Sequence, residues 1–119
     1  MNGNDSRDQE APGGLTGARV QQMASTVEVA EGAVVSRMLM KNAGGSVTIF
    51  AFDQGQSLSE HTAPFDALVH VIGGELIVTI GGEEHSLASD DAVLMPADVA
   101  HAVRAPRPAK FVLTMLKAQ

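Results

Sequence analysis

Short apolar runs alternate with turn residues along most of the chain. From Thr26 onward, runs of Val, Ile, Leu, Phe and Met are interrupted roughly every 8 to 12 residues by Gly, Asp, Asn or Pro. This spacing is typical of sandwiches and barrels, and no segment has the apolar repeat of an amphipathic helix. We therefore expect β-strands at residues 34–41, 46–53, 67–72, 75–80, 83–88, 92–96, 101–105 and 110–117.

Three Gly-Gly pairs punctuate this pattern, at residues 44–45, 73–74 and 81–82. Because Gly adopts positive φ without a steric cost, each pair predicts a tight hairpin between antiparallel strands. Residues 67–88 would then form a meander. Its strand at 75–80 is apolar on both faces in places, so we expect a second sheet or another subunit to cover it.

The ends of the pattern define one domain. Residues 1–17 are rich in Gly, Asn, Asp, Gln and Pro and are expected to be a flexible tail, followed by a single domain at 18–119. Residues 18–25 suit either a short helical turn or an extension of the first strand. The N-terminus lacks a secretory signal pattern, and no apolar run is long enough to span a bilayer, so we expect a cytoplasmic protein with no membrane partner.

Composition narrows the chemistry. The 119 residues are 45% apolar, enough for one core, and a net charge of −6 without a Lys/Arg cluster opposes nucleic-acid binding. The chain has no Cys, which excludes disulfides, thiolate nucleophiles and thiolate metal ligands. Ligand chemistry therefore falls to His and carboxylates.

Two blocks carry a family resemblance. Residues 55–74 read GQSLSEHTAPFDALVHVIGG, in which His61 follows Gly55 after five residues and Gly74 closes the block. In the second block, Pro96 and His101 stand at matching distances. Together the blocks resemble the two half-motifs of single-domain cupins, and the resemblance spans residues 46–117. It implies an all-β fold, an antiparallel jelly-roll barrel.

The blocks also depart from the cupin pattern. In metal-binding cupins, three histidines and a glutamate hold a divalent ion, but here Ala63 replaces the second histidine and Ala67 the glutamate. The resemblance therefore leaves His61 and His101 as ligand-binding and metal residues. Fe, Mn, Ni or Zn is the candidate cofactor, and the absence of any cofactor is the alternative. The usual glycines and asparagine of the second block are replaced by Asp90, Asp98 and Ala105.

Two further residues are candidates for the site. Asp66 would complete a set of two histidines and one carboxylate if a bulge turned it inward, although strand alternation gives the inward position to its neighbour. His70 shares the outward parity of Leu68 and Ile72, which favours an interface position. With Ile77, these apolar outer residues predict a homodimer.

The expected function is the binding of a small molecule inside the barrel, in a cavity widened by the two alanines, with His61 and His101 as polar anchors. One alternative is a metal-dependent enzyme resembling the dioxygenase-like or isomerase-like cupins. Another is a non-catalytic sensory or binding module, because one fold hosts many activities. No nucleophile elbow or paired carboxylates stand out, so no catalytic residue is assigned.

Overall fold

The computed structural model describes residues 14–118. A short 3₁₀ turn, η1 (Met23–Thr26), precedes nine strands, and this part of the chain contains no α-helix. It also has no helix long and apolar enough to cross a membrane. The strands are β1 (Val34–Asn42), β2 (Gly45–Phe52), β3 (Ser57–His61), β4 (Phe65–Gly73), β5 (Leu76–Ile80), β6 (Glu83–Leu87), β7 (Ala92–Met95), β8 (His101–Arg104) and β9 (Ala109–Lys117).

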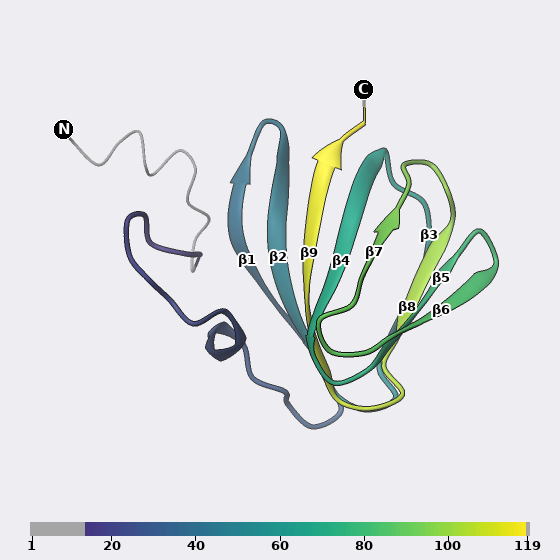
Figure 1. The fold of residues 1–119 in the computed structure, drawn as a ribbon, viewed down its shortest axis with the longest axis horizontal. Helices are drawn as coiled ribbons and strands as arrows, with labels where there is room; N and C mark the ends of the chain where they lie inside the picture. The colour runs from purple at the N-terminus through teal and green to yellow at the C-terminus, as the bar shows by residue number, and fades with distance from the viewer. Residues whose placement is uncertain (1–13, 119) are drawn as a thin grey trace.

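The nine strands form two antiparallel sheets (Figure 1). One sheet has five strands in the order β1-β2-β9-β4-β7, and the other has four in the order β3-β8-β5-β6. Neighbours in each sheet are mostly distant in sequence, as expected when a jelly roll passes repeatedly from one sheet to the other. The all-β, antiparallel jelly-roll class expected from the sequence is confirmed.

All eight expected strands are present, with ends that differ by a few residues at most. The sequence pattern predicted no strand at β3. This strand reads SLSEH, has one apolar residue, and lies at the edge of its sheet beside β8 alone. An edge strand with one solvated face needs few apolar side chains, so its pattern resembles that of a loop.

Two of the three Gly-Gly pairs lie at hairpins, and the third lies where the chain crosses between the sheets. Gly81 and Gly82 have φ of 57° and 85° and close the expected hairpin between β5 and β6. β1 and β2 form the expected antiparallel hairpin, but its turn is at residues 43–44, and Gly45 is already paired with Asn42 in the sheet. Neither Gly44 nor Gly45 has a positive φ. The meander expected at 67–88 is wrong, because β4 and β5 belong to different sheets. Gly74, with φ of 81°, lies where the chain crosses between the sheets.

The main core lies between the two sheets. Strand alternation is obeyed on β4, where Ala67, Val69 and Val71 are buried and Leu68 is exposed. These inward side chains pack with residues of both sheets, including Phe52, Phe111, Leu76, Val78, Leu87, Met95 and Val103. A core built from inward-facing positions of two sheets defines the inner faces, which also carry the two candidate histidines.

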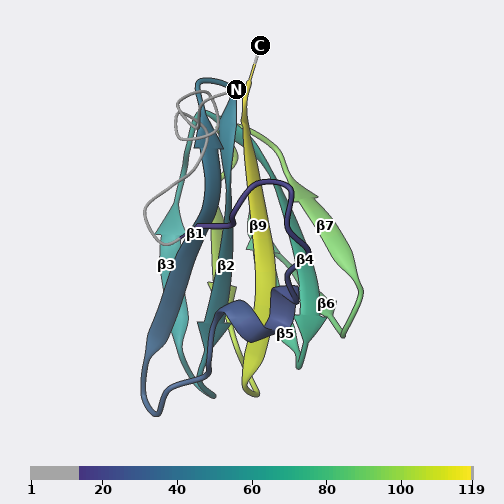
Figure 2. The ribbon, with the colours of Figure 1, turned by 90° about the vertical axis from the view of Figure 1, so that its left-hand side faces the viewer.

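A second apolar cluster covers the outer face of the five-stranded sheet. The segment before β1 lies across this face (Figure 2) and packs Leu15 and Val27 near Leu39 and Ile49. The backbone N–H of Leu15 donates to the carbonyl of Leu39 at 2.9 Å. Residues 14–17 were assigned to the tail, and residues 1–13 of that tail lie outside the described residues. The η1 turn falls within 18–25, where the sequence left a helical turn open.

Candidate functional site

A bulge in β3 brings the two histidines together. Leu58 pairs with Val103, and His61 pairs with His101, so three residues on β3 span two on β8. Without the extra residue, alternation from Leu58 would place Glu60 opposite His101. The bulge instead puts His61 there, on the inner face that His101 shares with Val103.

The two imidazole rings are in direct contact. Their Nε2 atoms are 3.1 Å apart, and the ring centroids are 4.4 Å apart at an interplanar angle of 73°. His101 is only 5% exposed, whereas His61 is exposed to solvent. The pair therefore consists of a buried ring in contact with a ring that solvent can reach.

Main-chain carbonyls fix the orientation of both rings. The Nδ1–H of His61 donates to the Ser59 carbonyl at 2.8 Å, and the Nδ1–H of His101 donates to the Val99 carbonyl at 3.2 Å. A neutral imidazole with its proton on Nδ1 has a lone pair on Nε2. Both Nε2 atoms are thus assigned as acceptors. Two acceptors do not bind each other, so a proton, a donor group or a cation is needed between them.

Burial makes this site a poor place for a charged His101. Loss of solvation lowers the pKa of His101 from its ordinary value of 6.5, and repulsion from a charged His61 lowers this pKa further. The hydrogen bond to the Val99 carbonyl partly offsets the decrease. The neutral form of His101 is therefore favoured at neutral pH, with its Nε2 lone pair free to accept.

The two motif blocks meet in space beside the histidines. The N–H of Asp98, in the loop before β8, donates to the Ala63 carbonyl, in the loop after β3, at 2.9 Å. Asp98 has φ of 63° and Asp90 has φ of 76°. These two positions replace the usual glycines of the motif, and Asp is among the few other residues that adopt positive φ readily. The backbone of the second block is thus preserved although its glycines are not.

Asp66 does not join the histidines. Its Oδ1 accepts the N–H of Ala97 at 3.0 Å, and its outward position is exposed, whereas Ala67 is buried in the core. The set of His61, Asp66 and His101 considered from the sequence is therefore not formed. The β4 strand keeps its alternation at this point, so no bulge turns the carboxylate inward.

The geometry of the histidine pair suits a metal ion only in part. Two nitrogens 3.1 Å apart, each about 2.0–2.1 Å from one ion, subtend roughly 100° at it, which is an acceptable angle for two ligands. Residues 14–118 nevertheless contain no group of three or more His, Asp or Glu side chains placed to hold an ion. Resident zinc or iron centres use three or more protein ligands. The pair therefore does not fit a complete resident metal centre.

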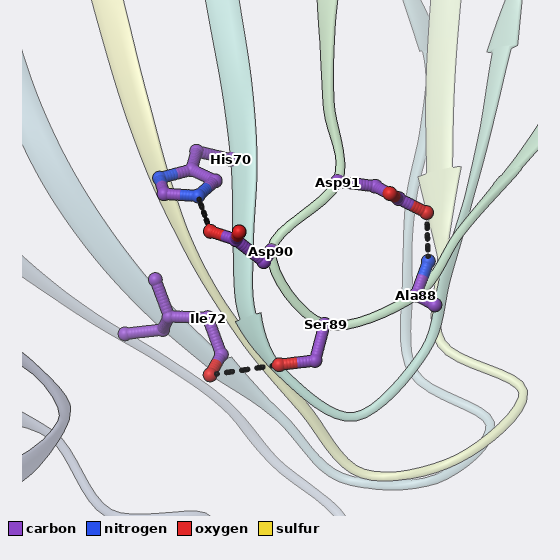
Figure 3. A network of polar contacts seen from close by, with 6 residues as sticks. All are labelled: His70, Ile72, Ala88, Ser89, Asp90 and Asp91. Carbon is purple, nitrogen blue, oxygen red and sulfur yellow. Dashed lines mark hydrogen bonds and ion pairs between the residues drawn. The ribbon is translucent and has the colours of Figure 1, made fainter.

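His70 lies away from the pair, on the outer face of β4. Its Nε2 is 3.0 Å from the Oδ1 of Asp90 in the loop between β6 and β7 (Figure 3). The same loop is attached to β4 by a bond from the N–H of Asp90 to the Val71 carbonyl and by one from Ser89 Oγ to the Ile72 carbonyl. Because both side chains of this hydrogen-bonded pair are well exposed, the pair positions the loop only weakly.

The comparisons with known proteins agree with this architecture. A family model described as a cupin domain matches residues 48–116. A conserved protein of unknown function from Streptococcus pyogenes has a similar structure, with 28% identity, a TM-score of 0.83, and coverage of 88% of this chain and 92% of that one. A cupin superfamily protein from Desulfitobacterium hafniense has 27% identity, a TM-score of 0.81, and coverage of 87% and 95%.

A third solved structure, a cupin 2 conserved barrel domain protein from Leptotrichia buccalis, is 34% identical, with a TM-score of 0.78. The match covers 80% of this chain and 46% of that protein. No curated protein matches this chain.

Proposed function

We propose, from the premise that this chain belongs to the cupin family, that it binds a small molecule between its two sheets with His61 and His101 as polar anchors. The observation that carries this proposal is the convergence of two Nε2 acceptors whose Nδ1 atoms are both engaged by carbonyls. An amine, or two neighbouring hydroxyls of a polyol, supplies the two donor hydrogens that these acceptors lack. Burial of His101 strengthens such a bond, because little water competes for it.

The ligand class is tested with probes that differ only in their donors. Sugars and polyols, each paired with its deoxy analogue, are screened by thermal shift and by ¹⁵N chemical shifts of the histidine side chains. We expect a hydroxylated probe to stabilise the protein and to shift the Nε2 signals of both rings. His61→Ala and His101→Ala should each abolish this binding, whereas His70→Ala, the control on the outer face, should retain it. Equal binding by the double variant would refute the anchoring role.

A divalent ion shared by the pair is the second candidate, because the nitrogen spacing suits two ligands of one ion. Water or the ligand would then fill the remaining coordination positions of the ion. Such a site is compatible with the metal-dependent enzyme alternative. Purified protein is analysed for Fe, Mn, Ni and Zn before and after supplementation. Near-stoichiometric metal that is lost in His61→Ala/His101→Ala supports this candidate. Metal that persists in the double variant, or none after supplementation, rejects it.

We also propose that the chain forms a homodimer through the outer face of its five-stranded sheet. The segment before β1 covers part of this face, but Leu68, Leu94 and Leu116 are 43%, 56% and 57% exposed. Leu68 and Leu94 are direct cross-strand partners, and a second copy would bring the same apolar surface against them. Of the other residues named from the sequence, Ile72 packs in the chain's own outer cluster and Ile77 belongs to the other sheet, so the three do not share one face.

The oligomeric state tests this interface. Sedimentation at micromolar concentration should give a dimer for the native protein and a monomer for Leu94→Glu. Val20→Glu, at a position 98% exposed and outside the sheet, is the matched control and should remain dimeric. A monomeric native protein contradicts the proposal.

A further inference from the structure

An apolar hollow opens at the end of the molecule where β1 turns into β2. It has a volume of about 350 Å³ and is lined by Met38, Lys41, Asn42, Ala43, Gly45, Ser46, Phe65, Met115 and Lys117. This volume lies within the usual range for small-molecule sites. Neither of the two alanines expected to widen the cavity lines it, and neither candidate histidine does.

Strand pairing places the hollow on the inner face of the five-stranded sheet. Lys41 pairs with Ser46, and Ser46 pairs with Met115, so the three form one row across β1, β2 and β9. Met115 packs against the main core, which fixes this row as inward-facing. Phe65 pairs with Lys117 one strand further on and closes the hollow at the start of β4. The hollow is thus bounded by the ends of four adjacent strands.

The lining combines an apolar base with a positive rim. Met38, Phe65 and Met115 provide apolar surface, and methionine side chains adapt to ligands of different shape. Lys41 and Lys117 are exposed and form no ion pair with any residue in 14–118. They lie on strands separated by β2, and Lys117 is two residues beyond the position level with Lys41, so their Cα atoms are about 12 Å apart. Flexible lysine side chains reach one anionic group from that separation.

We infer that this hollow binds an amphipathic carboxylate, whose apolar body rests on the two methionines and Phe65 and whose acid group meets Lys41 and Lys117. The charge of the rim favours an anion although the whole chain carries −6. The N–H of Lys117 donates to the Gly44 carbonyl at 2.9 Å, which holds the end of β9 against the β1-β2 turn. The rim therefore has a defined backbone before any ligand arrives.

Chain length and head group give the first test, with saturated carboxylates of six, eight and ten carbons as probes. Because burial of a methylene contributes about 0.8 kcal/mol, we expect the Kd to fall about fourfold per added CH₂. Octylamine should bind at least about tenfold more weakly than octanoate, because a cation replaces the anion beside two ammonium groups. Equal binding of acid and amine, or no dependence on length, would overturn the inference.

The location is tested with ¹³C-methyl methionine labels. Octanoate should shift the signals of Met38 and Met115, while Met40 and Met23, which do not line the hollow, should remain unchanged. Lys41→Gln and Lys117→Gln should each weaken octanoate binding about two- to fivefold and leave 1-octanol binding unaltered. Arg107→Gln is the matched loss of charge elsewhere and should have no effect. Octanoate binding that ignores both lysine variants would overturn the inference.

One variant separates this hollow from the histidine pair. His61→Ala/His101→Ala should bind octanoate as the native protein does, even where it no longer binds hydroxylated probes or metal. Loss of octanoate binding in this double variant would overturn the assignment of the acid group to the lysines. The lysine-rimmed hollow thus stands or falls independently of the histidine site.

Discussion

Replacing Gly74 by Ala tests why the first motif block closes with glycine. A Cβ at this position would overlap the carbonyl oxygen of Pro108 and approach Ala109 Cα to 2.9 Å, and both obstacles are backbone atoms. Gly82 provides the matched control. Its φ of 85° is close to the 81° of Gly74, but no atom lies within 4 Å of the position that an alanine Cβ would occupy there. Both substitutions therefore carry the same conformational strain, and only Gly74→Ala carries the clash.

The magnitudes follow from these two contributions. A left-handed Ala costs about 1–2 kcal/mol, and the reduced entropy of the unfolded chain returns about 0.4–1 kcal/mol. Gly82→Ala should thus lose roughly 0–1.5 kcal/mol. Gly74→Ala should lose about 1–3 kcal/mol more, because the β8-β9 connection must shift to accommodate the methyl group.

Urea unfolding followed by far-UV circular dichroism measures this difference, since the chain has no Trp or Tyr to report by fluorescence. With an m-value of about 1–3 kcal/mol/M, an extra loss of about 2 kcal/mol lowers the midpoint of Gly74→Ala by roughly 1 M relative to Gly82→Ala. Equal urea midpoints for the two variants would show that the backbone around Gly74 and Pro108 moves apart at little energetic cost. The close approach of Pro108 would then not explain the glycine.

Three further predictions concern stability. The φ of Asp98 is 63°, a region that Gly adopts easily and Val does not. Asp98→Gly should therefore raise the free energy of unfolding by about 0.5–1 kcal/mol, and Asp98→Val should lower it by about 1–2 kcal/mol, both measured by urea unfolding. A Val variant as stable as the Gly variant would contradict the strain argument. Since the folded pKa of His101 is lowered, its contribution to stability is complete above the unfolded value of 6.5 and declines as pH falls from there to the folded pKa. The stability of the native protein should therefore fall over this window more steeply than that of His101→Gln, and parallel pH profiles would count against it. Hydrogen bonds from the N–H groups of Gly32 and Gln54 lower the pKa of Asp53, so its contribution is present above 3.8 and is lost as pH falls through the folded pKa. Stability differences between the native protein and Asp53→Asn should therefore shrink on acidification below pH 3.8, and a difference that grows there would refute this assignment.

Patterns along the chain predicted most of the strands but not the partners of every strand. Alternation on β4 correctly placed Ala67 inward and Leu68 outward, because each strand residue points to the face opposite its neighbour's. The same sequence signal at residues 73–74 predicted a hairpin, yet Gly74 connects two different sheets. A positive φ permits a sharp turn but does not say which strand the chain meets afterwards.

The candidate site divides in the same way. The spacing of the two blocks was sufficient to select His61 and His101, and the fold places them opposite one another on neighbouring strands. Their ring contact depends on the bulge in β3, which no period-2 pattern contains because the bulge interrupts that period. Lys41 and Lys117, which border the hollow, were not singled out from the sequence, because a Lys at a strand end is usually solvated.

By itself, the sequence determined that this protein is a two-sheet β domain with two histidines available for ligand chemistry, because alternation, turn residues and motif spacing are local properties of the chain. Strand alternation also placed Asp66 and His70 outward. Tertiary structure alone decided that those imidazoles share one contact and that Lys41 and Lys117 border one apolar hollow. Each of these facts depends on which distant strands pair and in what register, and register is set by the whole core rather than by any one segment.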